Sequence, residues 1–246
     1  MNLLREYIRI SLNEIIGDNC DVLAVFDFDD TLVTSNLART ILNKPSGNDF
    51  NKALTAYRCG EMTFREYQES AFVESGLTIE NINNSSREIG VIREGFAEIV
   101  KLMKEVNGEI IVVSAGLDCY IKPVLTKYGL HSIEIFSVKT KSDHETPIIF
   151  QYDNISGPCK GDWAICKCSV IQRLRDKHKN NARIMFIGDG SLSDKCASLQ
   201  CDYVVATGRL SKMLDNMGID HIKFEDSFSA IIDDIKHVVL NDGVRM

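Results

Sequence analysis

Short, continuous runs of apolar residues alternate with helical patterns along most of the chain. Continuous apolar runs are typical of strands that are buried on both faces, as in a parallel sheet. Such runs occupy residues 22–26, 110–113, 133–136, 184–187 and 203–205. Apolar residues at helical spacing occupy residues 96–106, 120–128, 170–178 and 228–240. This order predicts an α/β fold with a doubly wound, Rossmann-like parallel sheet.

Residues 34–95 interrupt this alternation. They contain helical patterns, such as residues 49–54 and 64–72, and no strand-like run. Residues 81–87 read NINNSSR, a composition that is typical of a turn and a helix cap. We therefore expect an α/β core formed by residues 1–33 and 96–246, and a small helical cap of residues 34–95 inserted after the first strand.

The charge and hydropathy of the chain limit what it binds. A net charge of −7 disfavours binding to the phosphate backbone of nucleic acids, which requires a basic face. No apolar run approaches the roughly 18 residues that a membrane span needs. Residues 1–16 carry charged side chains among apolar ones at helical spacing, unlike a signal peptide. We expect a cytoplasmic protein that binds neither nucleic acid nor membrane.

The eight cysteines of the chain require a separate interpretation. Without a secretory signal, and in a chain long enough to form a large core, we expect reduced and mostly buried thiols rather than disulfides. Cys159, Cys166 and Cys168 lie close together, which raises structural zinc as an alternative. Their spacing differs from the paired cysteines of zinc-binding motifs, and no histidine follows at ligand distance. Zinc is therefore the less favoured interpretation.

Polar residues follow three of the strand-like runs, where parallel sheets bind their ligands. They are Asp27 and Asp29 after the first run, Ser114, Ala115 and Gly116 after the second, and Asp189 and Asp194 after the third. Carboxylates gathered in one cleft repel each other, so the cluster implies a hard divalent cation. The Ser114 segment can bind phosphate oxygens through its hydroxyl and backbone N–H groups. Each group alone is also typical of a turn or helix cap, but their joint order favours a site.

This order resembles the motifs of haloacid-dehalogenase-superfamily phosphatases. Residues 26–32, FDFDDTL, resemble the first motif, Ser114 resembles the second, and Gly188-Asp189-Gly190 with Asp194 resembles the fourth. The helical insertion resembles the small cap of the phosphoserine-phosphatase-like branch. The resemblance implies an enzyme that hydrolyses a small phosphomonoester through an aspartyl-phosphate, with Asp27 as nucleophile and Asp29 as general acid and base.

The resemblance also implies a Mg²⁺ cofactor and a phosphate-binding set. The implied metal site comprises Asp27, Asp29 through its backbone carbonyl, Asp189 and Asp194. The implied phosphate-binding residues are Thr31, Ser114, Ala115, Gly116 and a lysine that begins a helix. Four residues separate Asp189 from Asp194, where close relatives commonly have three, so Asp194 is either a direct ligand or one that acts through a neighbour.

Two lysines fit the third motif. Lys167 stands immediately before an apolar-periodic helix and is favoured, whereas Lys160 is the alternative. The Cys166-Lys167 segment resembles the methionine-salvage enolase-phosphate phosphatases and the phosphocholine/phosphoethanolamine phosphatases. This resemblance implies a small phosphorylated enol, choline-like alcohol or vitamin-like alcohol as the substrate.

Two positions count against phosphoserine as the substrate. Asn36 stands where phosphoserine phosphatases carry a glutamate, and no counterpart of their cap arginine occurs near Ala71. A phosphotransferase using the same aspartyl-phosphate and a phospho-accepting, Mg²⁺-binding regulatory domain are the alternative functions. Asp29 argues against the regulatory domain, which needs no acid or base two residues after its phosphorylated aspartate.

Overall fold

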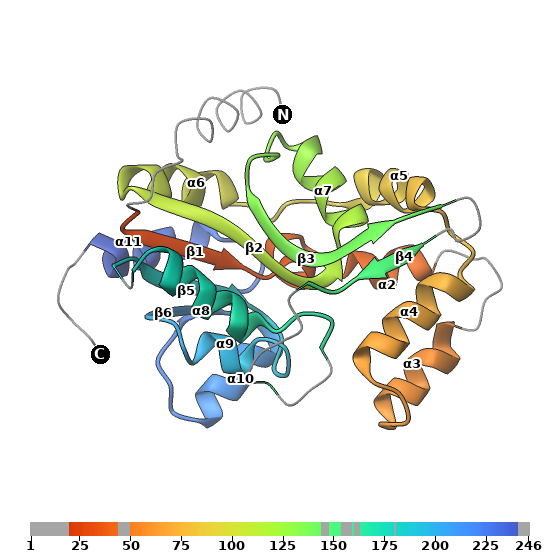
Figure 1. The fold of residues 1–246 in the computed structure, drawn as a ribbon. Helices are drawn as coiled ribbons and strands as arrows, with labels where there is room; N and C mark the ends of the chain where they lie inside the picture. The colour runs from red at the N-terminus through yellow and green to blue at the C-terminus, as the bar shows by residue number, and fades with distance from the viewer. Residues whose placement is uncertain are drawn as a thin grey trace.

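A seven-stranded sheet lies at the centre of the molecule (Figure 1). The computed structural model describes residues 20–43, 50–143, 148–153, 159, 163–179 and 181–240. In order across the sheet, the strands are β4 (Ile149–Gln151), β3 (Glu134–Lys141), β2 (Gly108–Leu117), β1 (Val22–Phe26), β5 (Arg183–Gly188), β6 (Tyr203–Ala206) and β7 (Ile222–Lys223). Neighbouring strands are parallel except for β3 and β4, which pair in antiparallel fashion.

The central strand β1 explains the continuous apolar runs in the sequence. Its side chains are fully buried, and they alternate between two hydrophobic clusters. Val22, Ala24 and Phe26 belong to one cluster, whereas Leu23 and Val25 belong to the other. Helices therefore cover both faces of the sheet, which leaves no position on β1 for a polar side chain.

Two groups of helices form these covering layers. Residues of α6 (Phe96–Glu105), α7 (Asp118–Lys127) and α11 (Ile232–Leu240) belong to the first cluster. Residues of α8 (Lys167–Lys177), α9 (Lys195–Ser198) and α10 (Gly208–Asn216) belong to the second. Two single turns, η1 (Phe28–Leu32) and η2 (Ser229–Ile231), complete this part. The doubly wound α/β fold is confirmed, although β4 and β7 were not predicted.

The segment between β1 and α6 is helical, as the sequence predicts. It contains α2 (Leu37–Leu42), α3 (Phe50–Arg58), α4 (Phe64–Glu74) and α5 (Ile79–Ile89). The prediction of a turn at residues 81–87 is wrong, because these residues lie inside α5. A capping box between Thr78 and Asn81 begins this helix, and Ile82 is fully buried where α5 packs against α7. The division into a core and a cap domain stays a prediction.

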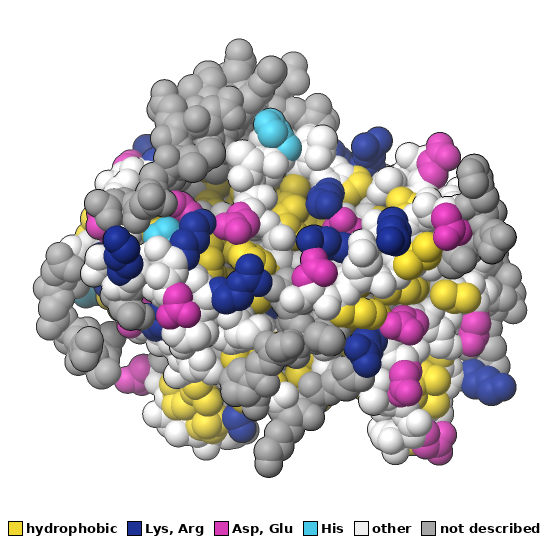
Figure 2. All heavy atoms as spheres, in the orientation of Figure 1, with side chains coloured by type: hydrophobic (Ala, Val, Ile, Leu, Met, Phe, Trp, Pro, Cys, Tyr) yellow, Lys and Arg dark blue, Asp and Glu magenta, His cyan; other side chains and the backbone are white. Residues whose placement is uncertain are grey.

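Three expectations from the sequence concern the surface charge, membrane-spanning helices and the N-terminal residues. Among the described residues on the face in Figure 2, lysine and arginine side chains are interspersed with acidic ones. Within the described ranges, no helix combines the length and apolarity required to cross a membrane. The helical pattern expected in residues 1–16 lies outside these ranges.

Buried Arg93 fastens the loop after β1 to the C-terminal part of the chain. Its Nε donates to the Thr31 carbonyl at 2.8 Å, and its Nη2 donates to the Asp30 carbonyl at 2.7 Å. Its Nη1 donates to the Glu225 carbonyl at 2.8 Å, and the guanidinium stacks over the Phe224 ring. One side chain therefore satisfies several backbone carbonyls and fixes the segment that carries the aspartates.

We expect Arg93→Ala to lower the free energy of unfolding by about 3 kcal/mol or more, because it leaves buried carbonyls without donors. Denaturant unfolding followed by circular dichroism measures this loss. Arg87→Ala, on an exposed position of α5, is the matched control and is expected to stay within about 0.5 kcal/mol of the wild type. Equal unfolding midpoints for the two variants would contradict the role of Arg93.

Candidate active site

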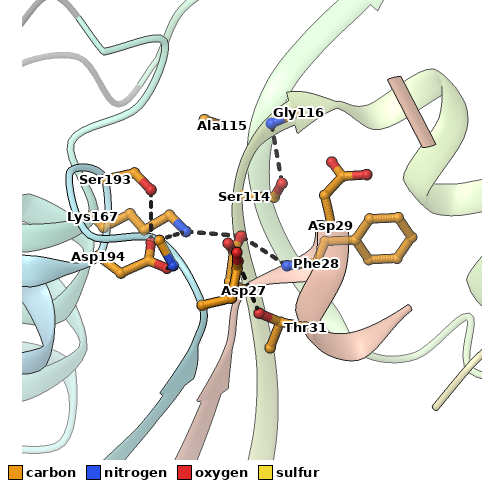
Figure 3. Close-up of polar contacts among 12 residues, drawn as sticks. Asp27, Phe28, Asp29, Thr31, Ser114, Ala115, Gly116, Lys167, Ser193 and Asp194 are labelled. Carbon is orange, nitrogen blue, oxygen red and sulfur yellow. Dashed lines mark hydrogen bonds and ion pairs between the residues drawn. The ribbon is translucent and has the colours of Figure 1, made fainter. Parts of the chain in front are cut away.

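The carboxyl ends of β1, β2 and β5 bring the predicted polar residues to one edge of the sheet (Figure 3). Asp27 follows β1 and its backbone N–H donates to the Ile187 carbonyl of β5 at 2.8 Å. Carboxylate oxygens of Asp27, Asp189 and Asp194 all lie within 4.8 Å of one another. A pocket of about 220 Å³ opens beside them and is lined by residues of both the sheet edge and α2 to α4.

Lys167 joins two of these carboxylates. Its Nζ lies 2.8 Å from Asp27 Oδ1 and 2.7 Å from Asp194 Oδ1. The helix α8 begins at Lys167, as the sequence predicts, and the residue is only 3% exposed. Although burial alone would lower it, the pKa of Lys167 is raised by Asp194 and Asp27, which keeps the ammonium charged. Lys160, the alternative, lies outside the described residues.

Asp194 is fully buried, and both of its carboxylate oxygens accept hydrogen bonds. Oδ1 accepts from the Ser193 hydroxyl at 2.9 Å in addition to Lys167, and Oδ2 accepts from the Gly190 backbone N–H at 2.7 Å. A Cβ at Gly188 would lie 2.8 Å from Oδ2, so the end of β5 needs glycine there. These contacts favour Asp194 as a residue that positions Lys167 and the Gly190 loop.

The cluster contains more negative charge than Lys167 neutralises. Burial raises the pKa of Asp27 well above its usual value, in spite of the nearby Lys167 ammonium. Burial, together with Asp194 and Asp30, raises the pKa of Asp189 to about 6. A hard divalent cation between these oxygens would stabilise their charged forms, and Mg²⁺ prefers oxygen ligands of this kind. The residues present therefore fit Mg²⁺.

The Asp29 side chain points away from the Asp27 carboxylate (Figure 3). Its Oδ1 accepts from the Leu37 backbone N–H at 2.7 Å, and its Oδ2 accepts from the Tyr120 hydroxyl at 2.8 Å. Burial raises its pKa to about 6, while the hydrogen bond from Tyr120 opposes this shift. Asp29 lines the pocket and is held apart from the cluster, a placement suited to proton transfer.

Four of the five predicted phosphate-binding residues line the same pocket. Ser114, Ala115 and Gly116 line it, and the Gly116 N–H donates to Ser114 Oγ at 3.0 Å. A Cβ at Gly116 would lie 1.8 Å from the Tyr120 hydroxyl oxygen, so only glycine fits there. Thr31, fully buried, donates from Oγ1 to Asp189 Oδ1 at 3.3 Å. Thr31 therefore contacts a carboxylate rather than the pocket.

The helices α2 to α4 supply pocket residues that the sequence analysis missed. Gln68 of α4 donates from Nε2 to the Ala115 carbonyl at 2.8 Å, and its buried Oε1 has no hydrogen-bond partner among the described residues. Asn36 and Ala71, the two positions that count against phosphoserine, also line the pocket. Other lining residues are Arg39, Tyr57, Phe64, Tyr67, Tyr120, Trp163 and Arg209. One signal in the sequence could have indicated Gln68. It lies three residues before Ala71, so the two residues share one face of a helix.

Comparison with known proteins agrees with this arrangement. The model of a protein family described as "Putative Phosphatase" matches residues 22–227. A 2-hydroxy-3-keto-5-methylthiopentenyl-1-phosphate phosphatase of Bacillus cereus (strain AH187) is 27% identical over 221 residues, which are 87% of this chain and 95% of that enzyme. The phosphatase of the same name from Brevibacillus brevis is 28% identical over 133 residues, 54% of this chain and 58% of that enzyme.

A solved structure shares the fold. It is described as a phospho-aspartyl intermediate analogue of phosphoserine phosphatase, with a TM-score of 0.60 and 16% sequence identity, over 88% of this chain and 99% of that one. The fold and these matches define a phosphatase of the haloacid dehalogenase superfamily. Within that superfamily, the chain belongs to the family described as "Putative Phosphatase", and it is a hydrolase.

Proposed function

We propose that this phosphatase hydrolyses a small phosphomonoester with Mg²⁺, through an aspartyl-phosphate on Asp27. The observation that carries the proposal is the meeting of Asp27, Asp189 and Lys167 at the base of one pocket. A carboxylate without a cation would repel a phosphate dianion. An adjacent ammonium and a metal ion offset that repulsion, while Asp27 lines the pocket.

Asp27, the Asp29 backbone carbonyl and Asp189 would hold the metal ion. Bound Mg²⁺ supplies positive charge beside the nucleophile and the transferred phosphoryl group. Asp194 is the fourth candidate, and its two hydrogen-bonded oxygens favour the positioning of Lys167 over direct binding. The Thr31 hydroxyl donates to Asp189 and orients that carboxylate.

Each step of the reaction assigns a proton or a bond to a residue of this chain. An Asp27 oxygen attacks phosphorus, the bond from phosphorus to the ester oxygen breaks, and Asp29 donates a proton to the leaving oxygen. Water then attacks the phosphorus of the aspartyl-phosphate while Asp29 takes a proton from it. The bond from phosphorus to the Asp27 oxygen breaks, which regenerates the Asp27 carboxylate and releases inorganic phosphate. Lys167 and the Ser114 hydroxyl bind the phosphoryl oxygens, on which charge develops.

The walls of the pocket favour one class of substrate. Tyr57, Phe64 and Trp163 form an aromatic side, with the Phe64 and Trp163 ring centroids 6.1 Å apart. Arg39 and Arg209 also line it, which disfavours a choline-like cation. A phosphorylated enol with an apolar tail, such as the substrate named for the Bacillus cereus relative, suits this combination.

A turnover screen tests the proposed function. We expect phosphate release to be fastest from 2-hydroxy-3-keto-5-methylthiopentenyl-1-phosphate or a similar enol phosphate, and to be lost in EDTA and restored by Mg²⁺. Phosphoserine is expected to be on the order of a hundredfold poorer in kcat/KM, because the neutral Asn36 stands in place of the glutamate that would pair with its ammonium. Phosphocholine and a phosphopeptide complete the panel.

Several outcomes would overturn parts of this proposal. Full activity in excess chelator would contradict the proposed Mg²⁺ dependence. A preference for phosphoserine of more than tenfold in kcat/KM would contradict the proposed substrate class. Transfer of the phosphoryl group to an added alcohol, in place of phosphate release, would show that the chain has the alternative function of a phosphotransferase. A single phosphorylation of each chain without turnover would establish the regulatory domain.

A further inference from the structure

Three cysteine thiols converge outside the phosphate pocket. The sulfur atoms of Cys159, Cys168 and Cys196 all lie within 4.8 Å of one another, and those of Cys159 and Cys168 are 3.3 Å apart. Cys168 is the second residue of α8 and Cys196 is the second of α9, while Cys159 precedes α8 in the chain. The cluster therefore joins three segments that are separate in the sequence.

A fourth thiol adjoins this cluster. Cys166, the N-cap residue of α8, is buried, and its thiol is among the groups that raise the pKa of the Cys159 thiol. All eight cysteines of the chain are free thiols in the structure. The sequence spacing of Cys159, Cys166 and Cys168 gave no zinc motif, because the completing residue is Cys196, which only folding brings to them.

We propose that Cys159, Cys168 and Cys196 bind a Zn²⁺ ion, with Cys166 as the fourth ligand. Sulfur atoms in a tetrahedral zinc site lie about 3.8 Å apart, as follows from Zn–S bonds of about 2.3 Å. The observed cluster reaches this arrangement with small side-chain movements. Soft thiolates select zinc, whereas the oxygen ligands around Asp27 select Mg²⁺, so the chain can hold two different ions.

A disulfide explains the cluster less well than a metal. A bond between Cys159 and Cys168 would use two of the sulfur atoms and leave Cys166 and Cys196 beside it without a role. Tetrahedral zinc uses the three clustered sulfur atoms, has a place for Cys166 as the fourth ligand, and crosslinks Cys159 to α8 and α9. The convergence of the thiols of α8 and α9 on Cys159 is the feature that favours zinc.

The position of the cluster gives the ion a structural role next to the catalytic machinery. Cys168 directly follows Lys167, and Cys196 lies two residues after Asp194. The Lys167–Asp194 ion pair and the thiol cluster therefore connect the same two helices, α8 and α9. Zinc would fix the relative position of these helices and, through them, the Lys167 ammonium.

Metal binding to the purified full chain tests this inference. We expect about one zinc per chain by elemental analysis of protein purified without chelator. After zinc removal under reducing conditions, Co²⁺ added in the presence of excess Mg²⁺ is expected to give thiolate-to-cobalt charge-transfer absorption and the intense visible bands of tetrahedral cobalt. Zinc should displace the cobalt, and the zinc-loaded form should have the higher Tm.

Cys196→Ser is the variant of choice, because Cys196 is exposed and serine is close to cysteine in size. It is expected to bind Co²⁺ about a hundredfold more weakly or not at all. Cys59→Ser, at an exposed cysteine just after α3, is the matched control and should bind as the wild type does. Circular dichroism of the variants verifies that they are folded.

The wild-type cobalt spectrum tests the site even if a variant fails to fold. Absence of the charge-transfer band in the reduced wild type, or unchanged cobalt affinity in folded Cys196→Ser, would overturn the inference. A Cys159–Cys168 disulfide in protein purified without reductant, with no bound zinc, would overturn it in favour of a redox pair. These measurements use no substrate, so they stand apart from the outcome of the phosphatase assays.

Discussion

Asp27→Asn is expected to abolish turnover, with a loss of kcat/KM on the order of 10⁴-fold or more. The amide oxygen of asparagine is a poor nucleophile, and no other carboxylate of the described residues occupies the same place at the end of β1. Its Oδ1 can still accept from the Phe28 N–H, so the local hydrogen bond at 2.8 Å is retained. Steady-state phosphate release measures the loss.

The fold is expected to survive this substitution. Asp27 shares one ammonium with Asp194 while Asp189 lies beside both, so an amide at position 27 removes negative charge from a crowded cluster. The unfolding midpoint without metal should therefore be no lower than that of the wild type. Asp234→Asn, at an exposed position of α11, is the control and should retain full activity.

A covalent readout separates the nucleophile from a residue that only binds metal. Acid-quenched wild-type enzyme should carry one labelled phosphoryl group on Asp27, and the Asp27→Asn variant should carry none. An Asp27→Asn variant that keeps more than a few per cent of activity would refute the covalent mechanism. A labelled residue other than Asp27 would reassign the nucleophile.

Local sequence patterns correctly predicted β1 and the start of α8, whose structure is determined by residues adjacent in the chain. The apolar run of β1 has the predicted bounds, and α8 begins at Lys167, because burial on two faces and the start of an apolar-periodic helix are both visible within a few residues. The joint order of the motifs likewise predicted that Asp27 and Asp189 converge, since parallel strands end at one edge of a sheet.

Long-range packing decided what the sequence did not predict. The asparagine- and serine-rich residues 81–87 form a helix because Ile82 and its neighbours pack against α7, which outweighs their low helix propensity. The contacts of Arg93 with Asp30 and of Gln68 with Ala115 join residues far apart in the chain, so no local pattern marks them. Cys196 joins the thiols near α8 in the same way.

Asp29→Asn is expected to change the dependence of the rate on the leaving group. General acid catalysis contributes roughly 10²–10⁴-fold, and an ester with a poor leaving group needs all of it. The variant should therefore lose most on an alkyl phosphate and least on p-nitrophenyl phosphate. The slope of log kcat/KM against leaving-group pKa, measured over substituted phenyl phosphates and one alkyl phosphate, should be steeper than in the wild type.

The hydrogen bonds of Asp29 allow the Asp29→Asn variant to be compared with the wild type without a change in side-chain position. Asparagine can accept from the Leu37 N–H and donate to the Tyr120 oxygen, so the side chain can stay in place without its acidic proton. Tyr120→Phe is the matched control, because it removes the 2.8 Å hydrogen bond and keeps the carboxylate. We expect this control to keep the wild-type slope with a smaller loss of rate. Equal losses on all esters in Asp29→Asn would mean that Asp29 holds the start of α2 through Leu37 and transfers no proton.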